Sequence, residues 1–154
     1  MSQAWLASSM VTDRARLSRY HTPTMAGKLR HIAISTKDPD KTAEFYKQVF
    51  DMHEVGRTDT HLAKGVYLSD GTINMAILDF KTDQLGRGLD YVGVHHFGFV
   101  VDSHDETDKR FDELGAECMQ ERPKDPTSFF EVKHRGPDGV VIDTTEHPWL
   151  GAKV

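Results

Sequence analysis

Alternating apolar and polar residues divide most of the chain into short strand-like segments, and two other segments have a helical period. Side chains on a strand face the same way at every second residue, whereas a helix repeats about every 3.6 residues. We predict eight strands, at residues 29–36, about 53–58, about 63–69, 73–79, 94–101, about 116–121, 128–134 and 140–145. We predict two helices, one from Pro39 to Phe50 and one from just after Ser103 to Gly115. This mixture of elements indicates the α+β class.

Local signals support the ends of these elements. Asp38 is a suitable N-cap, and Pro39 suits the first helical position, where no amide donor is needed. The segment Ser103-His104-Asp105-Glu106 has the form of a capping box. Asp70-Gly71 is typical of a hairpin turn, and Gly115 is typical of a residue that ends a helix.

The chain contains an internal repeat. A constant shift of 65 residues takes His31 to His96 and Tyr46 to Phe111. One strand, one helix and three strands therefore recur in the same order. We call this shift the repeat offset. We therefore expect two modules joined by a linker, with a flexible tail or arm before them and a short tail after them. The expected segments are 1–28 (N-terminal tail or arm), 29–83 (first module), 84–93 (linker), 94–147 (second module) and 148–154 (C-terminal tail).

One acidic residue stands in an unusual place in the last predicted strand. Asp143 follows the apolar run from Val140 to Ile142. Burying a carboxylate is costly unless it is paired or bound to a metal. Asp143 is therefore either a metal ligand or the partner of Lys133, of Arg135 or of a backbone group.

Composition and charge exclude several classes of function. The net charge of −5 and the scattered basic residues argue against a nucleic-acid surface. No apolar run approaches the roughly 20 residues of a membrane span, and the first residues lack the basic start of a secretory signal. The single cysteine, Cys118, excludes an intrachain disulfide and suits a reducing compartment. We expect a cytoplasmic protein without nucleic-acid or membrane partners.

Three segments together resemble the vicinal oxygen chelate superfamily, which includes glyoxalase I, methylmalonyl-CoA epimerase, extradiol dioxygenases and bleomycin resistance proteins. They are Arg30-His31-Ile32-Ala33-Ile34, His96-Phe97-Gly98-Phe99-Val100-Val101-Asp102 and Gly136-Pro137-Asp138-Gly139-Val140-Val141-Ile142-Asp143. The resemblance covers about residues 29–147. It implies an α+β fold in which two βαβββ modules form a curved, barrel-like mixed sheet around a metal cleft.

The resemblance also implies a metal site. In this family the ligands come from the first and fourth strands of each module, and the matching positions here are His31, His96 and Asp143, where relatives usually have Glu at the last. Imidazole suits Fe, Zn, Ni or Mn. His95 is adjacent to His96, and strict alternation would turn it to the opposite face. Because His96 is the repeat partner of His31, we expect His96 to be the ligand.

The fourth ligand position departs from the family pattern. A slightly longer shift, which takes Asp70-Gly71 to Asp138-Gly139, places Met75 there, and a slip of one residue would offer Asn74 or Ala76 instead. None of these residues is a carboxylate. Two histidines and one carboxylate are the set of non-haem Fe(II) oxygenases. The main expectation is therefore a ring-cleaving Fe(II) dioxygenase, with Zn, Mn or Ni as other possible metals. The alternatives are a glyoxalase- or epimerase-type lyase or isomerase, and a metal-free binding or resistance protein.

The segment before the last hairpin offers candidate acid–base residues. It alternates, so that Glu131 and Lys133 face one way and His134 faces the other. Either Glu131 or His134 could transfer protons in the cleft. The resemblance further implies a small-molecule substrate and a homodimer, in which a cleft could lie within one chain or across the interface.

Overall fold

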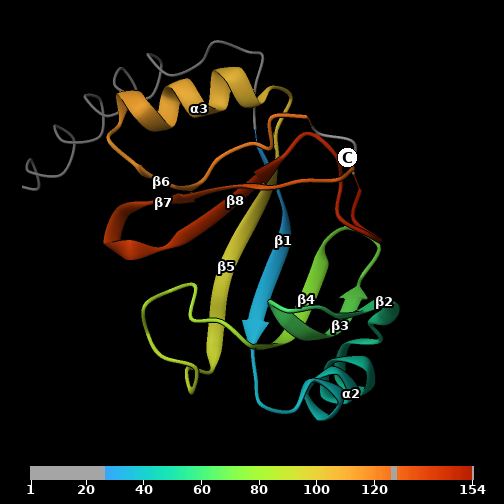
Figure 1. Cartoon of the computed structure of the whole chain (residues 1–154). Coiled ribbons are helices and arrows are strands. Elements are labelled where there is room, and N and C mark those ends of the chain that lie inside the picture. The colour runs from blue at the N-terminus through green and yellow to red at the C-terminus, as the bar shows by residue number, and fades with distance from the viewer. Residues whose placement is uncertain (1–26, 126–127, 154) are drawn as a thin grey trace, which may run out of the picture.

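The structure is a computed structural model that describes residues 27–125 and 128–153. Nearly all of the predicted N-terminal tail lies outside these residues. The elements, in chain order, are β1 (Lys28–Ser35), α2 (Pro39–Phe50), β2 (His53–Asp59), β3 (Ala63–Ser69), β4 (Asn74–Phe80), β5 (Gly93–Val100), α3 (His104–Glu113), β6 (Glu117–Gln120), β7 (Val132–Arg135), a 3₁₀ turn (Pro137–Gly139) and β8 (Val141–Thr145) (Figure 1). In this described part of the chain, neither helix is long and apolar enough to cross a membrane.

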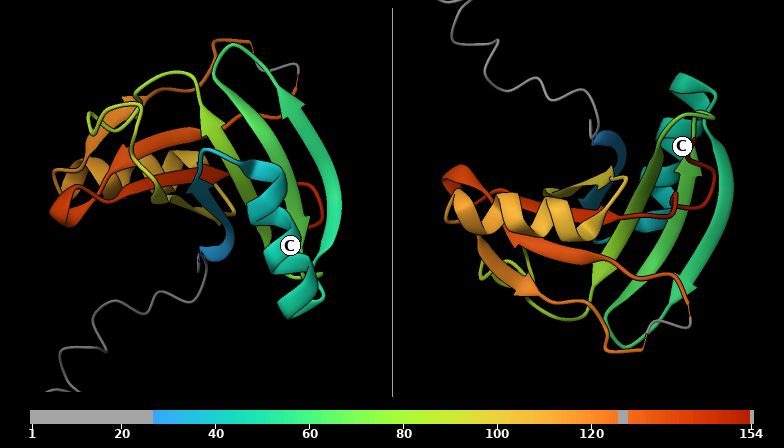
Figure 2. Two further views of the ribbon diagram at one scale, coloured as in Figure 1. Left: turned by 90° about the horizontal axis from the view of Figure 1, so that it is seen from below. Right: turned by 90° about the horizontal axis from the view of Figure 1, so that it is seen from above.

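All eight strands belong to one mixed sheet with the order β2-β3-β4-β1-β5-β8-β7-β6. Within the first half β1 pairs parallel with β4, and within the second half β5 pairs parallel with β8. The two halves join through the antiparallel pair β1 and β5. The sheet is curved but not closed, and both helices lie on its outer side (Figure 2). The predicted α+β class and the two βαβββ modules are therefore confirmed, as an open curved sheet.

The strand predicted at 128–134 is shorter than expected. The pairing of β6 with β7 runs only from Glu117 with Arg135 to Gln120 with Lys133. Beyond Gln120 the described residues form no further strand on this side, and β7 begins at Val132. Of the residues just before it, Phe129 and Glu131 line the cavity described below, whereas Phe130 stacks on His104 of α3.

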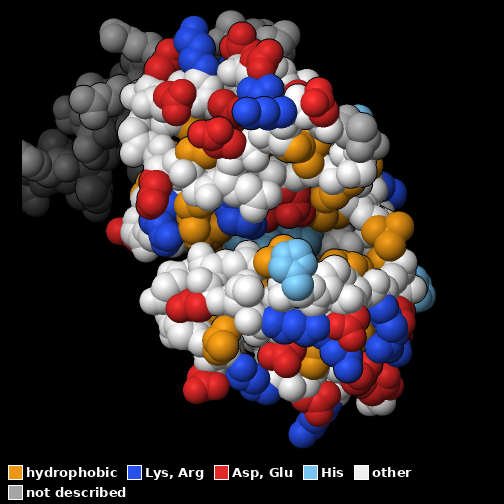
Figure 3. Space-filling model, in the orientation of Figure 1, with side chains coloured by type: hydrophobic (Ala, Val, Ile, Leu, Met, Phe, Trp, Pro, Cys, Tyr) orange, Lys and Arg blue, Asp and Glu red, His pale blue; other side chains and the backbone are white. Residues whose placement is uncertain are grey.

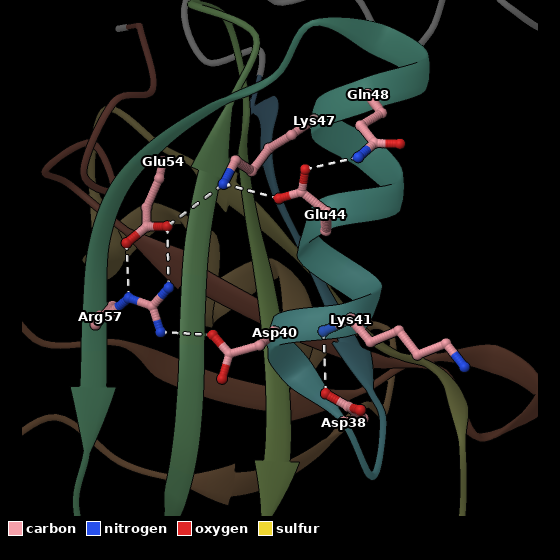
Figure 4. Close-up of polar contacts among 8 residues, drawn as sticks. All are labelled: Asp38, Asp40, Lys41, Glu44, Lys47, Gln48, Glu54 and Arg57. Atoms are coloured by element: carbon pink, nitrogen blue, oxygen red, sulfur yellow. Dashed lines mark hydrogen bonds and ion pairs between the residues drawn. The ribbon is translucent and has the colours of Figure 1, made fainter.

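The two helices begin in the same way. The Asp38 carboxylate accepts a hydrogen bond from the amide of Lys41, and the Ser103 hydroxyl accepts one from the amide of Glu106 (Figure 4 shows the first). Both caps satisfy amides that have no partner inside the helix. The repeat offset takes Asp38 to Ser103, and it takes Lys41 to Glu106.

An arginine on each side ties the helix to the strand that follows it. Arg57 of β2 binds Asp40 of α2 at 2.7 Å and also Glu54 (Figure 4). Arg122, just after β6, binds Asp105 of α3 at 2.6 Å. The repeat offset also takes Arg57 to Arg122, and it takes Asp40 to Asp105. The repeat therefore extends to side-chain contacts on the outer surface.

The two faces of the first half hold different side chains. The outer face packs against α2 with Val66, Leu68, Ile77 and the partly buried Met75; Ala43 of α2 and Met52, just after α2, complete this cluster. The concave face carries smaller residues, of which the buried ones are Ala33, Ala63, Ala76 and Leu78. Small side chains leave room above the sheet, and the cleft described below occupies that room.

Candidate active site

A cavity of about 580 Å³ lies on the concave face, between the two halves of one chain. Figure 3 shows this side of the molecule, with a hollow whose floor carries histidine, acidic and basic side chains. The wall is mainly apolar and includes Leu62, Tyr67, Phe80, Phe129 and Trp149. Thr58, Thr60, Gln84 and Gln120 also line it, and the histidine and charged side chains of its floor are described in turn below. Apolar walls around a few convergent polar groups are typical of a small-molecule site.

His31 of β1 is held in one orientation by Asn74 of β4. The Asn74 amide nitrogen donates to the carbonyl of Leu150 at 2.8 Å, so its oxygen faces Nδ1 of His31, also at 2.8 Å. His31 must therefore carry its proton on Nδ1, and Nε2 presents a lone pair to the cleft. Burial lowers the pKa of His31 to about 4, so the ring is neutral at pH 7.

A bulge in β5 brings two adjacent histidines to the cleft side. Ala33 pairs with His96, whereas the next residue along β1 pairs with Val94, which leaves His95 as the extra residue. The His95 ring stacks on the ring of Phe80, with centroids 3.9 Å apart, and Phe80 lines the cleft. The expectation that His95 points to the opposite face is wrong, because the bulge interrupts the alternation on which it depended.

Three histidines form a hydrogen-bonded row. Nε2 of His31 lies 3.2 Å from Nε2 of His96, and Nδ1 of His96 lies 2.8 Å from Nδ1 of His95. Because Nε2 of His31 has no proton, Nε2 of His96 is the donor in the first contact, and Nδ1 of His95 is the donor in the second. Burial holds the pKa of His96 well below its ordinary value and lowers that of His95 to about 4.

Asp143 of β8 comes to the same place from the other side. Its carboxylate is fully buried, and its Oδ2 lies 3.3 Å from Nε2 of His96. His31, His96 and Asp143, which the sequence offered as ligands, thus lie close together within one chain, whereas the sequence left open whether they would meet within a chain or across an interface. Burial raises the pKa of Asp143 above its ordinary value and Glu131 raises it further, whereas the Lys133 ammonium lowers it and holds the carboxylate charged.

Lys133 of β7 is the direct partner of Asp143. The two residues are opposite each other in the β7–β8 ladder. The Lys133 ammonium donates to Oδ1 of Asp143 at 2.5 Å and also to Oδ2. Only 7% of Lys133 is exposed, so this is a buried ion pair. One of the partners that the sequence offered for Asp143 is therefore present.

Glu131 and Trp149 complete the floor of the cleft. The Trp149 indole donates to Oε1 of Glu131 at 2.5 Å, and its ring stacks on His31 with centroids 4.8 Å apart. The ring lies over Gly98, where a Cβ would approach it to 2.6 Å. A glycine is thus required at this point of β5 so that Trp149 can reach both Glu131 and His31.

His134 and Met75 lie away from the cleft. His134 is on the other face of β7, where its ring stacks on Phe111 of α3 with centroids 4.0 Å apart. Of the two acid–base candidates, only Glu131 lines the cleft. Met75 packs toward α2, and the residue matched to Asp143 is Ala76, because Ala33 pairs with Ala76 as Gly98 pairs with Asp143. The sequence prediction used the shift of 68 residues between the two Asp-Gly turns, which leads from Asp143 back to Met75. The strand pairings give a shift of 67 residues, which leads to Ala76.

The donor atoms suit a divalent metal in their spacing but not in their state. A metal with bonds of about 2.1 Å holds neighbouring donors roughly 3 Å apart, as the two contacts of His96 Nε2 are. However, Nε2 of His96 carries a proton, and both oxygens of Asp143 are bound to Lys133. Ala76 offers no fourth ligand. Among the described residues, no three His, Cys, Asp or Glu side chains are arranged to hold a metal as they stand.

Comparisons with known proteins agree on the family and the fold. The family model of the Glyoxalase/Bleomycin resistance protein/Dioxygenase superfamily matches residues 28–144. No curated protein sequence matches the chain.

The similar solved structures include several methylmalonyl-CoA epimerases. A variant of the Streptomyces coelicolor enzyme in complex with 2-nitronate-propionyl-CoA is 19% identical, with a TM-score of 0.62, over 76% of this chain and 94% of that one. The Mycobacterium tuberculosis enzyme is 19% identical, with a TM-score of 0.62, over 86% and 95% of the two chains. A methylmalonyl-CoA epimerase in complex with methylmalonyl-CoA and NH₄⁺ is 17% identical, with a TM-score of 0.65, over 82% and 99%. At these identities the likeness shows the fold.

Proposed function

Because the chain belongs to the Glyoxalase/Bleomycin resistance protein/Dioxygenase superfamily, we propose that it is an enzyme acting on a small oxygen-bearing substrate in this cleft. We propose an isomerase or lyase that moves a proton at the carbon beside a carbonyl group. The similar folds of methylmalonyl-CoA epimerases support this alternative better than the ring-cleaving Fe(II) dioxygenase that the ligand count suggested.

The observation that carries the proposal is the meeting of a carboxylate, an ammonium group and two neutral imidazoles on the cleft floor. These groups are Glu131, Lys133, His31 and His96. Removing a proton beside a carbonyl needs a base for the proton and a positive group for the oxygen that becomes negative. Glu131 and Lys133 supply one of each. The two imidazoles are neutral, so they do not compete with the Lys133 ammonium for the negative oxygen.

Glu131 is the proposed base. Its carboxylate accepts the proton from the substrate carbon, and the electron pair left behind moves onto the carbonyl oxygen. The Lys133 ammonium stabilises that oxygen. Glu131 then returns the proton to a neighbouring atom, which gives an isomer, or it keeps the proton while a proton from solvent reaches the opposite face of the same carbon, which gives an epimer. The hydrogen bond from the Trp149 indole fixes the position of Glu131 through its Oε1.

The test is exchange of substrate hydrogen with solvent deuterium. The protein is incubated in D₂O with a panel of small α-substituted thioesters and ketones, methylmalonyl-CoA among them, and proton NMR follows loss of the α-hydrogen signal. Glu131→Gln should slow exchange by about 100- to 10,000-fold, the usual contribution of a general base. Glutamine keeps an acceptor for Trp149 but takes no proton. The exposed Glu121→Gln is the matched control and should leave the rate unchanged.

Two results would overturn the proposal. Oxygen uptake with catechols, without exchange on any compound of the panel, would favour the dioxygenase. Tight binding of a small molecule that undergoes neither reaction would favour a binding protein.

The cleft is formed within one chain, so the expected homodimer is not needed to build it. That homodimer and the cytoplasmic location stay predictions, and light scattering of the purified protein measures the first.

A further inference from the structure

We propose that Lys133 is the resident cation of this site and that its ammonium closes the set of His31, His96 and Asp143 to divalent metal ions. Its role toward substrate rests on the proposed function, whereas its effect on metal binding does not. The proposal makes two claims: Lys133 supplies the positive charge of the cleft, and its removal uncovers a latent metal site.

The position of Lys133 is built into the sheet. It faces Asp143 across the β7–β8 ladder, and its ammonium contacts both carboxylate oxygens. A surface lysine could turn into water, but here the lysine is 7% exposed and the aspartate 0% exposed. A buried charge is strongly held by its counter-ion, because separating the two would leave both without compensation.

The Asp143 carboxylate cannot bind both the Lys133 ammonium and a divalent metal ion well. A metal bound to Oδ2 of Asp143 would stand beside the Lys133 ammonium in a region shielded from water, where like charges repel strongly. The second cost is a change of tautomer. Nε2 of His96 would have to lose its proton to Nδ1, and His95 would have to change from donor to acceptor.

Lys133 is also the only Lys or Arg side chain that lines the cleft within residues 27–125 and 128–153. The positions in the first half that match Lys133 and Asp143 are Tyr67 and Ala76, which face each other across the β3–β4 ladder. Neither carries a charge. A negative oxygen on the substrate therefore meets one fixed cation, and that cation is Lys133.

Metal titration of the full-length chain tests the proposal without any substrate. After treatment with a chelator and its removal by dialysis, the natural chain, Lys133→Gln and Lys133→Arg are titrated with Ni²⁺, Zn²⁺ and Mn²⁺ by isothermal calorimetry. Surface histidines can bind metal weakly, so each protein is also tested with His96→Ala. Glutamine keeps a donor for Asp143 and removes the charge, whereas arginine keeps the charge. The exposed Lys64→Gln controls for loss of a lysine elsewhere in the sheet.

We expect Lys133→Gln to bind one equivalent of metal on the order of 100-fold more tightly than the natural chain, because the competing charge is gone. This binding should disappear when His96→Ala or Asp143→Asn is added. The metal should also raise the melting temperature of Lys133→Gln but not that of the natural chain, Lys133→Arg or Lys64→Gln. If Lys133→Gln does not fold without metal, its refolding is measured in the presence of each metal instead, and refolding that requires both metal and His96 provides the same test.

The proposal is overturned if the natural chain binds one equivalent of metal tightly and His96→Ala abolishes that binding. Lys133 would then turn aside to admit the metal. It is also overturned if folded Lys133→Gln gains no site that depends on His96. Neither result bears on the deuterium exchange, so failure of this inference is distinguishable from failure of the proposed function.

Discussion

The two halves of the molecule share one scaffold but contribute different chemistry to the cleft. The first half supplies His31 and an amide, Asn74, that sets its tautomer. The second half supplies His96 and the ion pair of Lys133 with Asp143. Outside the cleft the halves are alike, down to matched caps and matched arginine contacts on the helices.

This difference shows where a duplicated fold changes most easily. The helix caps and the strand order determine how each half folds, and both halves keep them. The concave face only has to leave room for a ligand, so its residues can differ without loss of the scaffold. The first half has Tyr67 and Ala76 where the second has Lys133 and Asp143. The charged groups of the site therefore come from one side, and the neutral wall comes mainly from the other.

The largest expected effect comes from breaking the ion pair of the second half. Asp143→Ala leaves the Lys133 ammonium buried without a partner, and should lower the free energy of unfolding by about 3–5 kcal/mol. The double variant Lys133→Met/Asp143→Leu removes both charges and should cost much less. Tyr67→Phe changes the matched position of the first half and should cost under about 1 kcal/mol. Urea unfolding measures all three, and equal effects of Asp143→Ala and Tyr67→Phe would refute the asymmetry.

The next effect concerns acid and the buried histidine of the first half. Burial lowers the pKa of His31 to about 4, so its contribution to stability is present above its ordinary pKa of 6.5 and is lost as the pH falls through about 4. Between pH 7 and pH 4, the natural chain should lose up to roughly 3 kcal/mol more than His31→Asn. The raised pKa of Asp143 acts in the opposite direction, but it is common to both proteins. Urea midpoints across pH are the measurement. His61→Asn, at an exposed position, should follow the natural chain, and parallel curves for His31→Asn would contradict the account.

A smaller effect tests the close packing around Gly98. Its counterpart in the first half is Ala33, which is fully buried. A Cβ at Gly98 would lie 2.6 Å from the Trp149 ring and 2.8 Å from Cβ of His31. Gly98→Ala should therefore cost about 1–3 kcal/mol and should also displace Trp149, which its fluorescence would report. Ala33→Gly should cost about 1 kcal/mol and leave the tryptophan signal unchanged. A tryptophan signal that is the same in all three proteins would mean that Gly98 does not position Trp149.

The smallest effect should be the same in both halves. Arg57→Ala removes the ion pairs with Asp40 and Glu54, and Arg122→Ala removes those with Asp105 and Asp108. Ion pairs at the surface contribute little to stability, so each variant should lower the urea midpoint only slightly, and the loss should shrink in high salt. A large loss in only one of the two would show that the halves differ on the outside as well.

Most of the fold could be predicted from the sequence, because the signals for it are local. Caps, turns and alternation predicted both helices and seven of the strands closely, and the repeat offset paired His31 with His96. Three features could not be predicted because they depend on neighbouring strands. The bulge at His95 arises where β1 and β5 pair, β7 starts late because β6 is short, and Ala76 replaces Met75 because the loops differ by one residue less than assumed.

The site was predicted in position more accurately than in chemistry. Asp143 stood out as a carboxylate in an apolar run, and a metal and Lys133 were competing explanations for it. Composition and spacing cannot decide between them, because the choice depends on which side chain reaches the carboxylate across the ladder. The structure shows that Lys133 does so. Asn74 and Trp149 acquire their roles only through the C-terminal segment that lies over β1 and β4.

The central claim is that Glu131, the base from the second half, works in a cleft whose floor His31 of the first half completes, and a double-mutant cycle between these two residues tests it most directly. The rate of α-hydrogen exchange is measured for the natural chain, His31→Gln from the first half, Glu131→Gln from the second, and the double variant. Residues that act together have strongly non-additive effects. We predict that the double variant is no slower than the slower single variant. Fully multiplied losses in rate would contradict the account, because they would show that the two halves contribute independently.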